Sequence, residues 1–242
     1  MEYKNNFILE VKHRFLKNPN VYNSSAWLFV DVVHEKNGTT YDNRIRLQYK
    51  CFSDYRVSDL GHGEFVAYYS NGVVSLTGGG LFLDVDDNWK GQRIGTYLMN
   101  KIIEWAKQWP DARVVTIRLL DGQATPDNKE RRNRFYQRFG IEFDFSDDQG
   151  ISGSSRPMRV SDLKLVTSWK ENITEIDTLA YIKEQKISLA NLQSNYENSQ
   201  RQLKALYEDQ RHPFKWFFNE IKPQLCIVGA VVFIFGLLIL SR

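Results

Sequence analysis

Residues 81–109, LFLDVDDNWKGQRIGTYLMNKIIEWAKQW, constrain the fold of this chain more than any other stretch. The apolar residues from Leu81 to Val85 alternate as in a half-buried strand, and those from Ile94 to Trp105 recur at helical spacing. The change of period predicts a strand, a glycine-bearing turn and an amphipathic helix. A helix that begins there directs unpaired N–H groups and a partial positive charge beyond the strand, which suits a phosphate.

The turn lacks both common phosphate-binding fingerprints, GxxxxGK[ST] and GxGxxG. It resembles the pyrophosphate-binding segment of the GCN5-related N-acetyltransferase (GNAT) superfamily, in which a valine-bearing strand and a short polar link precede Arg/Gln-x-x-Gly-x-Gly/Ala. Val85 matches the strand valine, Lys90 takes the Arg/Gln place and Gly95 the last glycine. Arg93 stands where the middle glycine is expected. The alternative is an ordinary strand–turn–helix connection eased by a glycine.

The resemblance implies that this turn binds acetyl-CoA, with the pyrophosphate on the backbone amides of residues 92–95. The Arg93 side chain offers a further charge for the pyrophosphate. Asn133, or less favoured Asn128, is a second donor for the pantetheine or the phosphates. The implied cofactor-binding residues are Val85, Lys90, Gln92, Arg93, Ile94, Gly95, Thr96 and Asn133.

Residues 133–141, NRFYQRFGI, resemble the other signature of the superfamily, a short helix with a Phe-Tyr pair that ends in a glycine before the next strand. Gly140 suits the position just after a helix. The resemblance makes Tyr136 the candidate general acid, which protonates the departing CoA thiolate. Alternatively, Tyr136 and its neighbours Phe135 and Phe139 only pack this helix against the sheet.

The rest of the first 167 residues predicts a mixed α+β (α/β) fold with a GNAT-like central sheet and flanking helices. Alternation and turn residues indicate strands at 7–15, 26–34, 44–52 and 64–70, with no helix among the first eighty residues. Further along we expect a strand at 112–120, and the resemblance implies that it runs parallel to residues 81–85 and diverges from them. A helix at 127–139, a strand at 141–145 and the last strands within 156–166 complete this expected fold.

A general base is not assigned by the sequence. The acids Asp84, Asp86 and Glu64 are available, and surface acids are the ordinary interpretation of all three. The basic helix face at residues 131–138 suits the CoA 3′-phosphate, an anionic membrane, nucleic acid or plain solvent.

Composition limits the other classes of site. A chain of 242 residues with net charge +3 has room for one domain of about 150–170 residues plus appendages, and the charge alone does not indicate nucleic acid. The two cysteines and four scattered histidines predict neither a disulfide framework nor a metal site. The polar N-terminus predicts no signal peptide.

The C-terminal third is predicted as a helical stalk at 173–222 and a single transmembrane helix within 223–242. Apolar residues recur every seven positions from Ile182 to Leu203, which indicates either a homo-oligomeric coiled coil through residues 176–207 or one amphipathic helix packed on its own domain. Residues 225–240, LCIVGAVVFIFGLLIL, are apolar throughout. This run favours a membrane anchor over a buried core helix, with aromatic and basic residues before it that place the N-terminal domain in the cytoplasm.

The sequence therefore predicts a membrane-tethered N-acetyltransferase that transfers acetyl from acetyl-CoA to an amine of unknown identity. The alternative is a catalytically inactive module of the same fold that binds CoA or a partner at the membrane. A third interpretation is a membrane-associated nucleic-acid binder that uses the basic face at residues 131–138.

Overall fold

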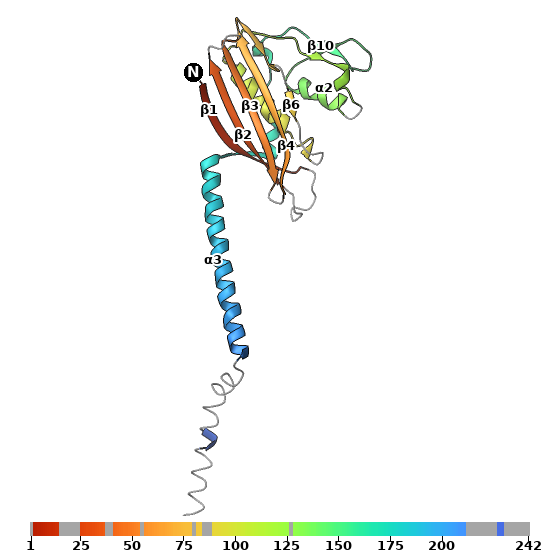
Figure 1. Cartoon of the computed structure of the whole chain (residues 1–242). Helices are drawn as coiled ribbons and strands as arrows, with labels where there is room; N and C mark the ends of the chain where they lie inside the picture. The colour runs from red at the N-terminus through yellow and green to blue at the C-terminus, as the bar shows by residue number, and fades with distance from the viewer. Residues whose placement is uncertain are drawn as a thin grey trace, which may run out of the picture. The chain divides into compact units, whose positions relative to one another are not determined.

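A computed structural model describes residues 2–14, 25–36, 41–53, 56–78, 81–83, 89–125, 128–211 and 227–229. The chain divides into two compact units, Met1–Tyr181 and Ile182–Arg242. The first unit contains the sheets and two of the helices, and the second contains most of a long helix (Figure 1).

The elements follow one another as strands first and a mixture of strands and helices later. The strands are β1 (Glu2–Lys12), β2 (Ser25–Lys36), β3 (Asn43–Ser53), β4 (Arg56–Ser70), β5 (Val73–Ser75), β6 (Leu81–Leu83), β7 (Arg113–Val114), β8 (Arg118–Leu119), β9 (Phe143–Phe145), β10 (Gly153–Ser155) and β11 (Ile173–Asp177). The α-helices are α1 (Ile94–Ala106), α2 (Lys129–Arg138) and α3 (Thr178–Arg211), and the 3-10 helices are η2 (Asp121–Gln123), η3 (Val160–Asp162) and η4 (Ser168–Glu171).

The large sheet has the order β11-β1-β2-β3-β4-β5-β7, with β6 also paired to β4. Strands β1, β2, β3 and β4 form an antiparallel meander, which confirms the four strands predicted for the first eighty residues. The described residues of this region contain no helix, as expected. A smaller sheet has the order β8-β10-β9.

The predicted central helix is confirmed as α1, which lies behind the meander in Figure 1. Within α1 only Lys101 and Glu104 are not buried, so the helix is enclosed by the domain rather than laid on its surface. Its apolar side chains join those of alternate positions on β2 and β3, such as Leu28 and Leu47, in one hydrophobic core. Complete burial of each such side chain stabilises the fold by about 1.5–3 kcal/mol.

The single strand predicted at 112–120 is wrong, because two short strands in different sheets occupy this stretch. β7 pairs in parallel with β5, whereas β8 pairs with β10. The break follows from the hydrogen bonds. Val115 N–H still donates to the Val74 carbonyl at 2.8 Å, but Ile117 directs its N–H to Ser155 Oγ at 2.9 Å and accepts from Ser155 N–H at 2.9 Å.

The last strand also differs from the prediction at 156–166. The structure has β10 just before this stretch, and within it only an isolated bridge from Arg159 to Arg113 and the 3-10 helix η3. Pro157 lacks the N–H that a central strand needs. In addition, the Asp162 carboxylate accepts the Arg159 N–H at 2.8 Å, which favours a turn over an extended chain.

The stalk begins later than predicted. Residues 173–177 form β11, which pairs antiparallel with the edge strand β1 from Ile173↔Val11 to Asp177↔Phe7. The Asp177 carboxylate then accepts the Ala180 N–H at 2.9 Å, as an N-cap does. This cap starts α3 at Thr178, so the isoleucines of β11 lie in the sheet rather than in a helix.

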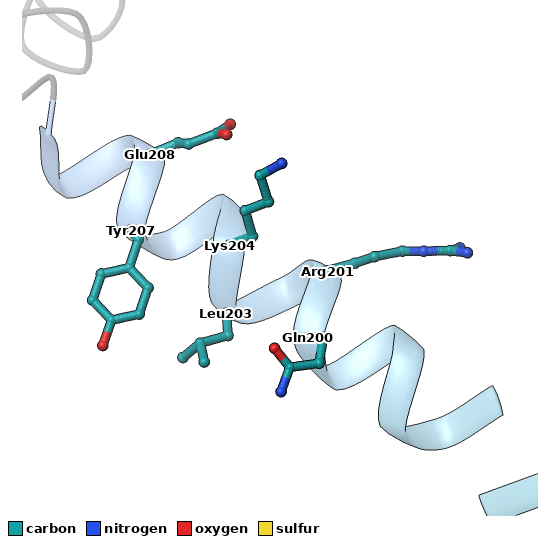
Figure 2. Close-up of a pocket in the computed structure, with 6 residues that line it drawn as sticks. All are labelled: Gln200, Arg201, Leu203, Lys204, Tyr207 and Glu208. Carbon is teal, nitrogen blue, oxygen red and sulfur yellow. The ribbon is translucent and has the colours of Figure 1, made fainter. Parts of the chain in front are cut away.

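In the second unit, α3 runs to Arg211 and every residue from 182 to 208 is exposed. Near its end, Leu203, Tyr207 and Gln200 project to one side of the helix and Lys204, Glu208 and Arg201 to another (Figure 2). Among the residues that the structure describes, no helix is both long and apolar enough to cross a membrane. The predicted span at 225–240 lies outside those residues except for 227–229.

Candidate functional site

The turn before α1 ends in a left-handed residue. Arg93 is the N-cap of the helix with φ 67° and ψ 13°, and Gly91 also has a positive φ of 79°. The first helical hydrogen bond runs from Tyr97 N–H to the Arg93 carbonyl at 3.0 Å, and no side chain caps the helix. The N–H groups of the first turn, residues 94–96, therefore lie ahead of the helical ladder, as an anion-binding helix end requires.

The turn is held against the end of β1. Gln92 is only 1% exposed, and its side-chain oxygen accepts the Arg14 N–H at 2.9 Å. Its side-chain nitrogen lies 3.3 Å from His13 Nε2. The Gln92 N–H already donates to the Trp89 carbonyl at 3.4 Å. Gln92 thus anchors the turn through its side chain, and the amides after it are the better candidates for a phosphate contact.

The Arg93 side chain has partners within the protein. The guanidinium donates to the Ser168 carbonyl and forms an ion pair with Glu171 at 2.8 Å. This side chain is 12% exposed. Both contacts use Nη1 of the guanidinium, and the charge contact between the Arg93 side chain and a pyrophosphate stays a prediction. Lys90, in contrast, is exposed at the surface of the turn.

The remaining residues predicted around the turn fall into two groups. Ile94 and Thr96 are buried at 2% and 5% exposure, and Gly95 is also buried, so these residues offer backbone N–H groups rather than side chains. Val85 lies outside the described residues, as do the candidate bases Asp84 and Asp86. The third acid, Glu64, accepts from Gln48 at 3.2 Å and faces Arg46 at 3.9 Å on the sheet.

The parallel pairing in the large sheet is short. The parallel pairing of β5 with β7 ends at Val74 and Val115, after which β8 joins β10 while β6 stays on β4. The predicted parallel pair of residues 81–85 and 112–120 is wrong, because β7 runs parallel to β5, whereas β6 pairs antiparallel with β4. Val115 is 38% exposed where the pairing ends. Strands that separate leave backbone groups available to an extended ligand.

Tyr136 lies on α2 and is 9% exposed. Its ring packs edge-on against Phe143 and Phe135, with centroids 5.5 and 5.2 Å away. Burial raises the pKa of Tyr136 to about 12, and the nearby Arg132 guanidinium opposes this rise. Its hydroxyl makes no hydrogen bond to the described residues. The phenol is therefore protonated at neutral pH, as a general acid must be, while the ring also serves the packing role that was the alternative.

Asn133 is engaged within its own neighbourhood. Its side-chain nitrogen donates to the Gly150 carbonyl at 2.9 Å, and its oxygen accepts from Arg132 Nε at 3.1 Å. Arg132 is 9% exposed and also donates to the carbonyls of Leu120 at 3.0 Å and Ile151 at 2.6 Å. Both side chains fasten α2 to the loop before β10. This placement favours a structural role for Asn133 over cofactor binding.

The basic face of α2 is partly neutralised by neighbours on the same helix. Arg131 donates to Asn128 Oδ1 at 2.9 Å, and Arg134 pairs with Glu130 at 3.5 Å. These exposed contacts favour the solvated-face interpretation. Among the described residues, no group of three His, Cys, Asp or Glu side chains is arranged to hold a metal.

The sequence did not reveal the contacts that fix the turn. His13 and Arg14 come from the end of β1, and Ser168, Glu171 and Asn172 from a segment some eighty positions later in the chain. None of these residues belongs to a motif. Only the fold brings them to Gln92 and Arg93.

The first unit thus has a mixed α+β fold, in which the parallel pairing of β5 with β7 is short and the N-terminus of α1 has no side-chain cap. Residues 32–141 match the model of the Acetyltransferase (GNAT) family. This stretch of the first unit is therefore similar to a GNAT acetyltransferase domain. Comparisons with curated proteins and with solved structures gave no match.

Proposed function

We propose that this protein transfers an acetyl group from acetyl-CoA to an amine. The family match carries this proposal, and it is supported by the first turn of α1, whose amides lie ahead of the helical ladder. The pyrophosphate of acetyl-CoA would accept hydrogen bonds from residues 93–96 there.

In the proposed reaction, the amine nitrogen attacks the thioester carbonyl, the new C–N bond forms and the C–S bond breaks. Tyr136 gives its proton to the departing thiolate, which leaves as CoA thiol. The attacking nitrogen loses its proton to a base that no described residue identifies. Tyr136 carries the proton that this step needs, because a phenol is protonated at neutral pH, although the rise of its pKa to about 12 makes it a weaker acid than an exposed tyrosine.

A non-catalytic CoA-binding module is the second candidate. Two observations favour it: Arg93 replaces a glycine of the resembling motif, and the one described candidate base, Glu64, is already paired with Gln48 and Arg46. Such a module would bind acetyl-CoA without releasing thiol, whatever amine is offered.

Acetyl-CoA should raise the melting temperature of the full-length chain, because a ligand that binds only the folded state stabilises it. Ligand at about a hundred times its Kd adds roughly 2.7 kcal/mol, which is several degrees for a domain of this size. Gly95→Trp should abolish the shift, because it places a large side chain within the first turn of α1, where the pyrophosphate is proposed to bind. Gly95→Asp is the matched variant: a carboxylate suits a helix N-terminus but repels a phosphate. If acetyl-CoA raised the melting temperature equally in the parent and in both variants, it would bind at another site.

We further propose that α3 pairs in parallel with a second copy and that residues 225–240 anchor the chain in a membrane, with the domain in the cytoplasm. The apolar stripe of α3 is solvent-exposed at Ile182 (50%), Leu189 (67%) and Leu203 (47%). Its heptad flanks carry mostly Ser, Asn and Gln, so identical helices can meet without like-charge repulsion.

A single experiment tests both parts of this arrangement. Two cysteine variants are made in full-length protein that carries Cys226→Ser. Ser199→Cys places a cysteine on the apolar stripe of α3, and Ser194→Cys places one on the opposite face of the helix. Under oxidation, the first variant should form covalent dimers in the membrane fraction and the second should not. Equal cross-linking of the two variants would refute the parallel pair, and alkaline release of the protein from membranes would refute the anchor.

A further inference from the structure

Residues 166–177, here called the strap, follow one face of α1 and then join the sheet as β11. The Asn100 side chain makes two 2.8 Å hydrogen bonds with the backbone N–H and carbonyl of Val166. One turn earlier on α1, the Tyr97 ring meets Trp169 edge-on at 4.9 Å and its hydroxyl donates to Glu175 at 2.6 Å. The strap therefore fixes α1 over successive turns toward its N-terminus.

The strap reaches the candidate cofactor turn at Arg93. This residue has φ 67°, a conformation that side chains other than glycine, asparagine and aspartate rarely adopt. Glu171 and the Ser168 carbonyl, both in η4, hold its guanidinium. No side chain caps the N-terminus of α1. The unfavourable backbone of Arg93 thus coincides with a side-chain contact to the strap.

A second strap contact fixes the peptide bond that precedes Arg93. Asn172, only 6% exposed, donates to the Gln92 carbonyl at 2.9 Å and to the Lys12 carbonyl at 3.2 Å. Because a trans peptide is planar, its carbonyl and N–H point in opposite directions. Holding the Gln92 carbonyl toward Asn172 therefore turns the Arg93 N–H away from Asn172.

We propose that the strap positions the acetyl-CoA site, with Arg93 and Glu171 as positioning residues. The ion pair keeps the Arg93 backbone in the left-handed conformation. This conformation orients the N–H groups of the first turn of α1 toward the ligand. The inference about the ligand rests on the proposed function, whereas the inference about the conformation of the turn does not. It also explains how an arginine can replace the glycine that this conformation normally requires.

The decisive comparison is between Arg93→Ala and Arg93→Gly in the full-length chain, titrated with CoA in a calorimeter. Alanine loses the ion pair and still disfavours the left-handed backbone, so CoA affinity should fall about tenfold. Glycine also loses the ion pair but adopts the conformation freely, so affinity should stay within about threefold of the parent. A role through charge alone would weaken both variants equally, and that result would overturn the proposal.

Two strap variants complete the test. Glu171→Gln should weaken CoA binding by about threefold, since the Ser168 carbonyl still holds the guanidinium. Glu175→Gln is the matched control: it neutralises another strap carboxylate, which accepts the Tyr97 hydroxyl and pairs with Lys101 at 3.0 Å, away from the cofactor turn. It should leave CoA affinity unchanged. Equal losses in these two variants would show a general structural effect and would contradict the positioning role.

Hydrogen exchange in the absence of ligand separates failure of this inference from failure of the proposed function. The Tyr97 amide, which donates to the Arg93 carbonyl, should exchange about tenfold faster in Arg93→Ala and at the parental rate in Arg93→Gly, because only alanine disfavours the left-handed conformation that supports this bond. If this pattern holds while no variant binds CoA, the strap inference stands and the proposed function falls. If exchange is unchanged in Arg93→Ala, the strap does not set the turn.

Discussion

Replacing Tyr136 by phenylalanine should lower the rate of acetyl transfer by about 10²-fold or more, because it removes the proton donor for the CoA thiolate. The ring would remain, so its edge-on contacts with Phe143 and Phe135 should preserve the packing of α2. Acetyl-CoA affinity should therefore change little. The measurement is the initial rate of thiol release at saturating acetyl-CoA.

The raised pKa gives this prediction a pH dependence. Burial lifts the pKa of Tyr136 from 10.0 to about 12, so the phenol keeps its proton across the neutral and mildly alkaline range. Its folded pKa lies above the unfolded one, so the stability it contributes is complete below about pH 10 and is lost as the pH rises through about 12. The parent should lose stability in that window, and Tyr136→Phe should not lose this part.

Tyr97→Phe is the matched control for the loss of a buried phenol. Burial and Glu175 also raise the pKa of Tyr97, but its hydroxyl is bonded to the strap rather than directed at a substrate. Tyr97→Phe should keep most of its turnover. Turnover of Tyr136→Phe equal to that of the parent would remove Tyr136 from the mechanism and leave it as a packing residue.

Asn100→Leu should destabilise the first unit by about 2–3 kcal/mol, the second large effect that we expect. Asn100 is 3% exposed, and its amide satisfies both the N–H and the carbonyl of Val166. Leucine has a similar size but can make neither bond, so two backbone groups lose their partners at about 1–1.5 kcal/mol each. The shift is measured as the change in unfolding free energy in urea.

The control for that substitution is Asn191→Leu on α3, where the side chain is exposed and helical as well. It should change the unfolding free energy of the first unit by less than about 0.5 kcal/mol. A loss below about 1 kcal/mol in Asn100→Leu would mean that water replaces the amide, and that the strap is less firmly tied to α1 than its two bonds indicate.

Elements set by local patterns were predictable. The alternation in β2 and β3 and the helical period of α1 are properties of neighbouring residues, so they were visible in the sequence. The strand at 112–120 was misjudged because its alternation is continuous, whereas its partner changes from β5 to β10 midway. No local pattern records a change of partner.

The end of the domain illustrates the same limit. The residues of β11 continue into a helix without a glycine or proline, so the sequence favoured one long helix. In the structure these five residues pair with β1 as a strand, and the helix begins only after the Asp177 cap, at Thr178. A strand that pairs with residues more than 160 positions away has no local signal.

For the candidate site, the motif located the turn but not the roles of its side chains. Gln92 and Arg93 were expected near a pyrophosphate. Their side chains instead hold the turn against β1 and the strap, while their backbone remains in place for a ligand. The left-handed Arg93 gives a physical reason for the glycine of the resembling motif. Tyr136 stays the predicted acid, and its burial agrees with that role without testing it.

The measurement that tests the central claim most directly is thiol release from acetyl-CoA by the full-length chain, in the presence of a panel of peptide amines, polyamines and small metabolite amines. Acetyltransferase activity predicts release that saturates with both substrates, depends on at least one class of amine, and yields the acetylated amine in equal amount. Binding of acetyl-CoA without amine-dependent release for any class would contradict it and establish the first unit as a non-catalytic module.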